Sequence, residues 1–101
     1  MRDRKKDLNH HDVADEFERH GWSVEDVTAI NCFCDIHVSY PDKRCLWSWV
    51  EIKNGNKKLT NGEIKFRDKC YSIKSPYHIC RSIKDVAIII NHLERISHHE
   101  L

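Results

Sequence analysis

The chain has 101 residues, of which 40% are hydrophobic and 33% are charged, and its formal net charge is +1. This length fits one domain over residues 1–101, and the composition excludes a disordered or a membrane-spanning chain. No apolar run approaches the roughly 20 residues that cross a bilayer, and the charged start lacks the apolar stretch of a signal peptide. We therefore expect a cytoplasmic protein that does not bind membranes.

A helix is predicted over residues 9–20, because Val13 and Phe17 recur at helical spacing and Gly21 follows as a stop. Residues 22–27 then alternate apolar and polar side chains, which is typical of a half-buried strand. The stretch that follows has no clear period, so we expect a connecting loop.

Two further strands are predicted over residues 34–40 and 46–53, separated by a turn at residues 41–44. In the first of them, Ile36 falls on one side and Asp35 on the other. We expect the side with Ile36 to face a hydrophobic core.

A second helix is predicted from Thr60 to about Tyr71, since Thr60 and Glu63 form a capping-box pattern. A short strand is expected over residues 77–81, and a last helix opens near Ser82. The histidine-rich C-terminal end is expected to be a frayed tail. The order is helix, three strands, helix, strand, helix, which indicates an α/β domain.

The most informative pattern is Asp35 followed by Glu51 and Lys53. A hairpin centred near Lys43 would place Asp35 opposite Glu51, because both lie eight residues from that centre. Opposite residues bring their Cβ atoms to roughly 5 Å, and Lys53 shares the side of Glu51. Two carboxylates and a lysine are therefore expected to converge at one end of the sheet.

Two carboxylates at that separation suit Mg²⁺ or Mn²⁺, which prefer oxygen ligands. The backbone carbonyl of Ile52 is a candidate third ligand beside Asp35 and Glu51. Such a metal lowers the pKa of bound water, and Lys53 would hold that water and offset charge on the phosphate. The pattern favours phosphodiester hydrolysis, with a charged edge strand that serves only solubility as the alternative.

These residues resemble a known family. The order of Asp35-Ile36, then residues 50–55 (Val-Glu-Ile-Lys-Asn-Gly), then Lys58-Leu59-Thr60 with Glu63 is similar to the small VRR-NUC-type phage and bacterial nucleases. These belong to the PD-(D/E)xK, or restriction-endonuclease-like, superfamily. The resemblance covers nearly the whole chain. It departs at residues 30–34, which lack the glycine and proline that usually precede the aspartate.

The resemblance implies a restriction-endonuclease-like core, a mixed β-sheet flanked by helices, with Asp35 and Glu51 as metal ligands and Lys53 as the catalytic lysine. It also implies a further metal-site residue on or before the first helix, for which four candidates stay open: Asp7, Asn9, His10 and Asp12. Members look like homodimers that act on DNA, which suggests branched or four-way junction substrates. A catalytically inactive nucleic-acid-binding module of the same fold is the alternative.

Basic residues follow the catalytic strand and are predicted to contact DNA phosphates, with plain solvation as the alternative. They are Lys57, Lys58, Lys65, Arg67 and Lys69. Trp47 and Trp49 share the side of Glu51; we interpret them as core residues rather than as base-stacking or dimer-contact residues. His37 is interpreted as structural.

The chain has five cysteines, and no two of them form a Cys-x-x-Cys pair. Free, mostly buried thiols are the favoured interpretation in a reducing compartment. A structural zinc site and an intermolecular disulfide are the alternatives.

Overall fold

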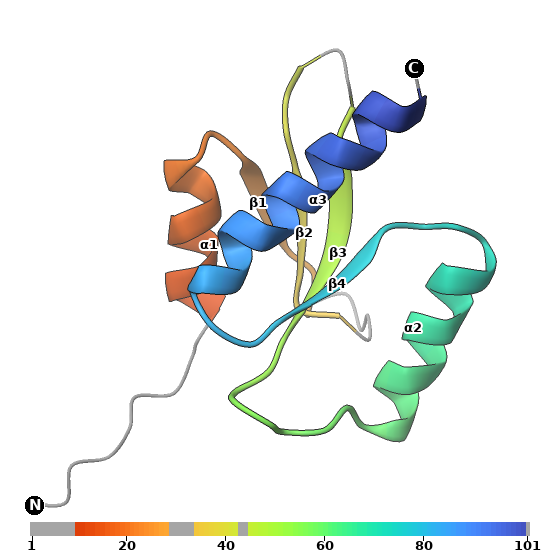
Figure 1. The fold of residues 1–101 in the computed structure, drawn as a ribbon. Helices are drawn as coiled ribbons and strands as arrows, with labels where there is room; N and C mark the ends of the chain where they lie inside the picture. Colours follow the sequence, from red (N-terminus) through yellow and green to blue (C-terminus); the bar gives the residue numbers. More distant parts are fainter. Residues whose placement is uncertain (1–9, 29–33, 43–44, 101) are drawn as a thin grey trace, which may run out of the picture.

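The structure is a computed structural model that describes residues 10–28, 34–42 and 45–100. Its elements follow the predicted order (Figure 1): α1 (His10–Arg19), β1 (Ser23–Asp26), β2 (Ile36–Ser39), β3 (Trp47–Ile52), α2 (Asn61–Ser72), β4 (Tyr77–Cys80) and α3 (Lys84–Glu100). The strands are shorter than predicted by one to three residues, although single backbone hydrogen bonds such as that from Tyr40 N–H to the Leu46 carbonyl continue beyond their ends. Among the described residues, no helix is long and apolar enough to cross a membrane.

The four strands form one mixed sheet in the order β1-β2-β3-β4. The β1–β2 and β2–β3 pairs are antiparallel, whereas β3 and β4 run parallel and are joined by the crossover that contains α2. Ile36 pairs with Val50 and His37 with Trp49, which is the register predicted for the hairpin. The protein is thus a small mixed α/β domain with a four-stranded sheet and three helices.

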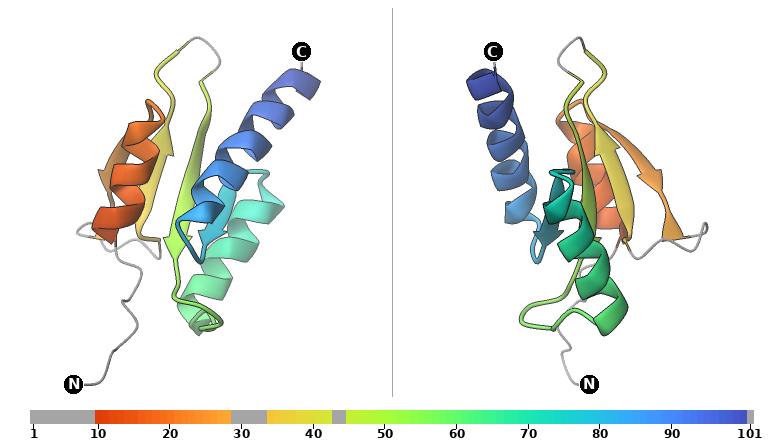
Figure 2. Two further views of the ribbon diagram at one scale, coloured as in Figure 1. Left: turned by 60° about the vertical axis from the view of Figure 1, so that its left-hand side comes forward. Right: turned by 90° about the vertical axis from the view of Figure 1, so that its right-hand side faces the viewer.

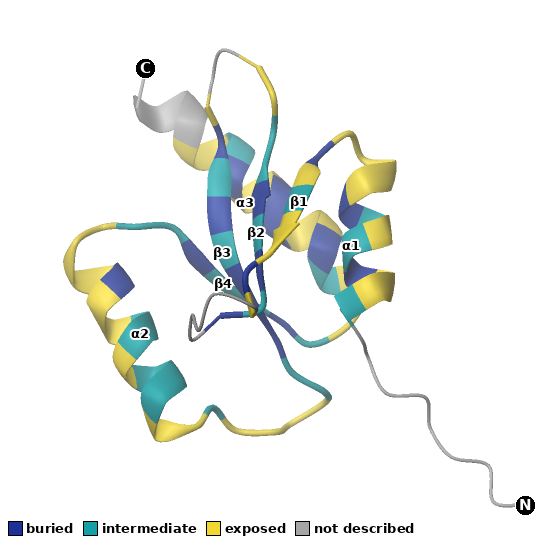
Figure 3. Ribbon diagram, turned by 180° about the vertical axis from the view of Figure 1, so that it is seen from behind, coloured by how far each residue is buried: buried dark blue, intermediate teal, exposed yellow. Residues whose placement is uncertain are grey.

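One face of the sheet, covered by α1 and α3, carries the hydrophobic core (Figure 2). Val13 and Phe17 of α1 and Val86 of α3 have no exposed surface, and they meet Ile36 and Val50 of the central strands. Side chains along β2 and β3 alternate between the two faces of the sheet, and the buried apolar ones point toward this face (Figure 3). Gly21, at φ +86°, ends the turn after α1 in the left-handed region, as its predicted stop role requires.

The opposite face is only partly covered, because α2 packs chiefly against β4 (Figure 2). Trp47 and Trp49 lie on this face and stay half-buried, so the prediction that they belong to the core was wrong. Instead they surround His37, whose ring lies 5.3 Å and 4.9 Å from theirs, and Trp49 meets Phe66 of α2. His37 makes these structural ring contacts, as expected.

The start of α2 and the end of α3 test two of the predictions made for these helices. The capping box of α2 is present, since Thr60 accepts from the backbone N–H of Glu63 and the Glu63 carboxylate accepts from that of Thr60. The helical backbone of α3 continues to Glu100, so the expectation of a frayed tail there was wrong. A helix already nucleated by packing extends at little cost.

The same isoleucine-to-valine substitution should lower stability at a buried position and leave it nearly unchanged at an exposed one. Ile36→Val should lower the free energy of unfolding by about 0.5–1.5 kcal/mol, since it removes a methylene group from a side chain that is 1% exposed. Ile88→Val, at a side chain that is 64% exposed, should change it by less than about 0.5 kcal/mol. Urea denaturation of both variants checks this, and equal losses would contradict the packing described here.

Candidate active site

The candidate site lies at the end of the sheet where β2 begins and β3 ends (Figure 1). Asp35 stands one residue before β2, and its backbone is held on both sides by bonds to Val27 and Val50. Its Oδ2 accepts a hydrogen bond from the backbone N–H of Ile52 at 2.7 Å. The hairpin register therefore brings the Asp35 carboxylate to the end of β3, as predicted.

The Glu51 carboxyl is buried beside Asp35. Glu51 is 2% exposed, and its Oε1 has no hydrogen-bond partner among the described residues. Burial raises the pKa of Glu51 well above its usual range, and the nearby negative charges of Asp35 and Glu63 raise it further. A buried acceptor without a partner is costly, so this carboxyl calls for a cation or a proton.

The Lys53 ammonium completes the group. Its side chain is 13% exposed, and Nζ lies 2.9 Å from Glu63 Oε1 and 3.9 Å from Glu51 Oε2. The hydrogen bond to Glu63 is the main reason why the pKa of Lys53 is raised. Asp35, Glu51 and Lys53, the three residues predicted to converge, thus lie together.

Glu63 belongs to the site as well, although the sequence indicated for it a capping role and a place in the family pattern, but no position in the site. Its Oε1 accepts both the backbone N–H of Thr60, at 2.8 Å, and the Lys53 ammonium. Glu63 lies in the first turn of α2, and its carboxylate reaches Lys53, just after the end of β3. No sequence spacing rule predicts this contact. The available signal was an acidic residue near the start of a helix that directly follows the strand carrying Glu51.

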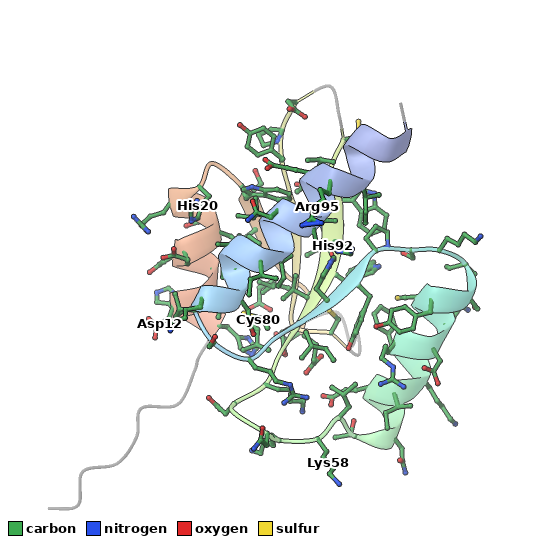
Figure 4. The ribbon with its side chains drawn as sticks, in the orientation of Figure 1. Asp12, His20, Lys58, Cys80, His92 and Arg95 are labelled. Carbon is green, nitrogen blue, oxygen red and sulfur yellow. The ribbon has the colours of Figure 1, made fainter. Side chains whose placement is uncertain are left out.

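Of the first-helix candidates, His10 contacts the site. Its Nε2 lies 3.3 Å from Asp35 Oδ1, so both oxygens of that carboxylate are engaged. Asp12 is exposed on α1 (Figure 4), while Asp7 and Asn9 lie outside the described residues. The residue that reaches the site from this helix is thus its first one.

The charges of the group match one divalent cation. When the carboxyls of Asp35, Glu51 and Glu63 are all ionised, the single ammonium of Lys53 leaves an excess of two negative charges, and without a cation the raised pKa of Glu51 keeps that carboxyl protonated at neutral pH. Hard oxygen donors and the unpartnered Glu51 Oε1 fit Mg²⁺ or Mn²⁺. In the part of the chain that the structure describes, no three His, Cys, Asp or Glu side chains are already gathered as a metal cage. Mg²⁺ commonly uses one or two carboxylates and keeps several waters, so two side-chain ligands suffice.

The basic residues predicted to contact DNA do not form one ridge. Lys57 and Lys58 are exposed in the loop before α2, and Lys65 and Lys69 are exposed on one side of that helix. Arg67 lies about 200° around the helix axis from Lys65, because each residue turns about 100°. It is bound to the neighbouring Asp68 at 3.0 Å, so it points elsewhere.

One hollow of the described surface lies away from this site. It is a groove of about 530 Å³ beside α3, and its walls include Leu46, Pro76 and Ile96. His92 of α3 also lines it (Figure 4) and bonds through Nδ1 to Nε2 of His78 at 2.8 Å. None of the candidate catalytic residues borders the groove, so its size says nothing about their substrate.

The four described cysteines are mostly buried, since three of them have little exposed surface, as the favoured interpretation expected. They are Cys34, Cys45, Cys70 and Cys80. Cys32 lies outside the described residues.

Comparison with protein-family models, with curated proteins and with solved structures gives no match for this chain. Any functional assignment therefore depends on the site itself.

The raised pKa of Glu51 predicts how stability depends on pH in metal-free protein. The folded-state pKa of about 9 exceeds the ordinary value of 4.5, so between these pH values the folded state binds the extra proton. Stability should fall as pH rises through this window, by more than about 1.4 kcal/mol, the equivalent of one pKa unit. Urea denaturation at pH 5, 7 and 9 with EDTA measures this.

Glu51→Gln should abolish most of that pH dependence, because the amide cannot ionise. Glu25→Gln, at an exposed carboxyl on β1, controls for the substitution itself and should behave as wild type. A Glu51→Gln variant that keeps the wild-type slope would show that another group carries it.

Proposed function

We propose that this protein is a metal-dependent nuclease that hydrolyses DNA phosphodiester bonds, with Asp35, Glu51 and Lys53 as its catalytic residues. The observation that carries the proposal is the buried Glu51 carboxyl beside Asp35: its Oε2 lies 3.9 Å from the Lys53 ammonium, and its Oε1 has no hydrogen-bond partner among the described residues. A structural ion pair would have each charge matched, whereas this group has two negative charges in excess once Glu51 is ionised. That excess at a sheet end suits a divalent cation.

The side chains divide the work between them. Asp35, Glu51 and the Ile52 carbonyl would hold Mg²⁺ or Mn²⁺, which when bound polarises a phosphoryl oxygen and acidifies water. The Ile52 N–H and His10 keep the Asp35 carboxylate in one orientation. Lys53 would orient the attacking water and offset charge that develops on the phosphate.

Glu63 acts as a positioning residue in this scheme. Its contact with Lys53 Nζ holds the ammonium 3.9 Å from Glu51 and keeps it protonated. Because the same carboxylate oxygen also caps α2, the position of the lysine ammonium is fixed by a helix rather than by a flexible loop.

The helix and strand order, and the parallel β3–β4 pair beside an antiparallel hairpin, are compatible with the restriction-endonuclease-like core that the sequence resemblance implies. We propose this fold assignment together with the nuclease activity. A homodimer and a preference for branched or four-way DNA belong to the same proposal. An inactive nucleic-acid-binding module is the second candidate, favoured by the exposed lysines Lys57 and Lys58 that follow the site.

Nuclease assays on supercoiled plasmid and on a labelled four-way junction test the proposal. Wild-type protein should cut in Mg²⁺ or Mn²⁺ and not in EDTA. Lys53→Ala and Glu51→Gln should each lower the rate at least about 100-fold, the usual cost of losing a charge-stabilising or proton-transferring group.

Arg95→Ala, which removes an exposed positive charge from α3, is the matched control and should cut DNA as the wild-type protein does. Cleavage that survives in Lys53→Ala would indicate a contaminating nuclease. DNA binding without cleavage in any metal would favour the inactive module, and neither binding nor cleavage would contradict both candidates.

Two substitutions of Glu63 separate its roles. Glu63→Gln retains a side chain that can cap α2 but loses the charge facing Lys53, so the pKa of Lys53 should fall. We expect the basic limb of the pH–rate profile to move to lower pH and the melting temperature to change little. Glu63→Ala should in addition cost about 1 kcal/mol of stability through the lost cap. An unmoved basic limb in Glu63→Gln would remove Glu63 from the mechanism.

A further inference from the structure

Arg81 links the end of β4 to the loop that follows the catalytic strand. Its Nη1 donates hydrogen bonds to the carbonyl oxygens of Gly55, at 2.8 Å, and Lys57, at 2.7 Å. The loop itself is closed by a bond from the Lys57 N–H to the Asn54 carbonyl at 3.0 Å. Figure 1 shows this loop leaving β3 close to where β4 ends. One guanidinium nitrogen thus braces the segment between Lys53 and α2.

The backbone of Arg81 is fixed beside the site. The Lys53 N–H donates to the carbonyl of Cys80, the residue before Arg81, at 3.0 Å. The N–H of Arg81 donates to Asp85 Oδ2 at 2.7 Å. Because Ile52 pairs with Cys80 in the parallel ladder, Arg81 lies one residue beyond the end of β4, level with Lys53. It therefore flanks the candidate catalytic group from a rigid position.

The guanidinium has five N–H donors, and the two on Nη1 are spent on the loop carbonyls. Its Nε and Nη2 make no hydrogen bond to the residues that the structure describes, and the bonds to the loop lie at the exposed surface. Those two nitrogens form the edge of an arginine that pairs side-on with a carboxylate or a phosphate. The bracing bonds hold this edge in place, so little side-chain entropy remains to be lost on binding.

The surroundings favour phosphate. The braced loop presents Lys57 and Lys58 to solvent, and Lys53 of the candidate catalytic group lies at the start of this loop. On the basis of the proposed function, we infer that Arg81 binds a backbone phosphate of the nucleic-acid substrate through Nε and Nη2, while Nη1 positions the lysine loop. Arg81 is outside the set of basic residues that charge clustering identified.

The test is DNA binding measured by fluorescence anisotropy in EDTA, where no cleavage interferes, as a function of salt. Arg81→Gln should raise Kd about tenfold and reduce the slope of log Kd against log salt by about 0.9, the value for one lost phosphate contact on duplex DNA. Arg81→Lys keeps the charge and the slope but loses the fork, so Kd should rise less. Arg95→Gln removes the same charge from α3, far from the loop that carries Lys58 (Figure 4), and should change Kd less than about twofold.

Circular dichroism melts show whether each variant is folded, and if Arg81→Gln is not, Arg81→Lys decides by its Kd. Wild-type binding with equal Kd values for Arg81→Gln and Arg95→Gln would overturn this assignment alone. A raised Kd with an unchanged salt slope in folded Arg81→Gln would also overturn it, because the arginine would then act only as a brace. Wild-type protein that neither binds nor cuts DNA would overturn the proposed function, and this assignment with it.

Discussion

The pairing of β2 with β3 is the constraint on which the rest of the structure depends. Its register sets Ile36 against Val50 in the core and, at the same time, brings the Asp35 carboxylate to the Ile52 N–H. A slip of one residue would turn every apolar side chain of β2 to the other face. Burial of the core therefore enforces the geometry of the site, and the carboxylates need no dedicated element to bring them together.

That geometry is costly for the folded protein. A carboxyl such as Glu51, nearly without exposure and with one oxygen unpartnered, is tolerated only because the hydrophobic face behind it is well packed. Its neighbours Asp35 and Glu63 add repulsion that Lys53 offsets only in part. Such local frustration is typical of sites that bind a charged ligand, since the ligand supplies what the chain lacks.

At the start of α2, one carboxylate both caps the helix and contacts a residue of the candidate site. The Glu63 carboxylate caps the helix at Thr60 and holds Lys53, while Arg81 holds the loop between them. The segment that connects β3 to α2 is consequently braced from both sides. Because α2 packs chiefly against β4, its packing alone would leave this loop, and Lys53 beside it, poorly positioned.

The sequence by itself determined the element order, the hairpin register and the convergence of Asp35, Glu51 and Lys53, because alternation and turn position are local and the ladder propagates them. Only the tertiary structure decided the contacts of Glu63 and Arg81, since these contacts join segments whose approach depends on how the helices pack. The same holds for Trp47 and Trp49. Parity gave their face correctly, but their exposure depends on how much of that face α2 covers. Periodicity reports which side a residue takes, whereas burial and partners depend on what lies opposite it.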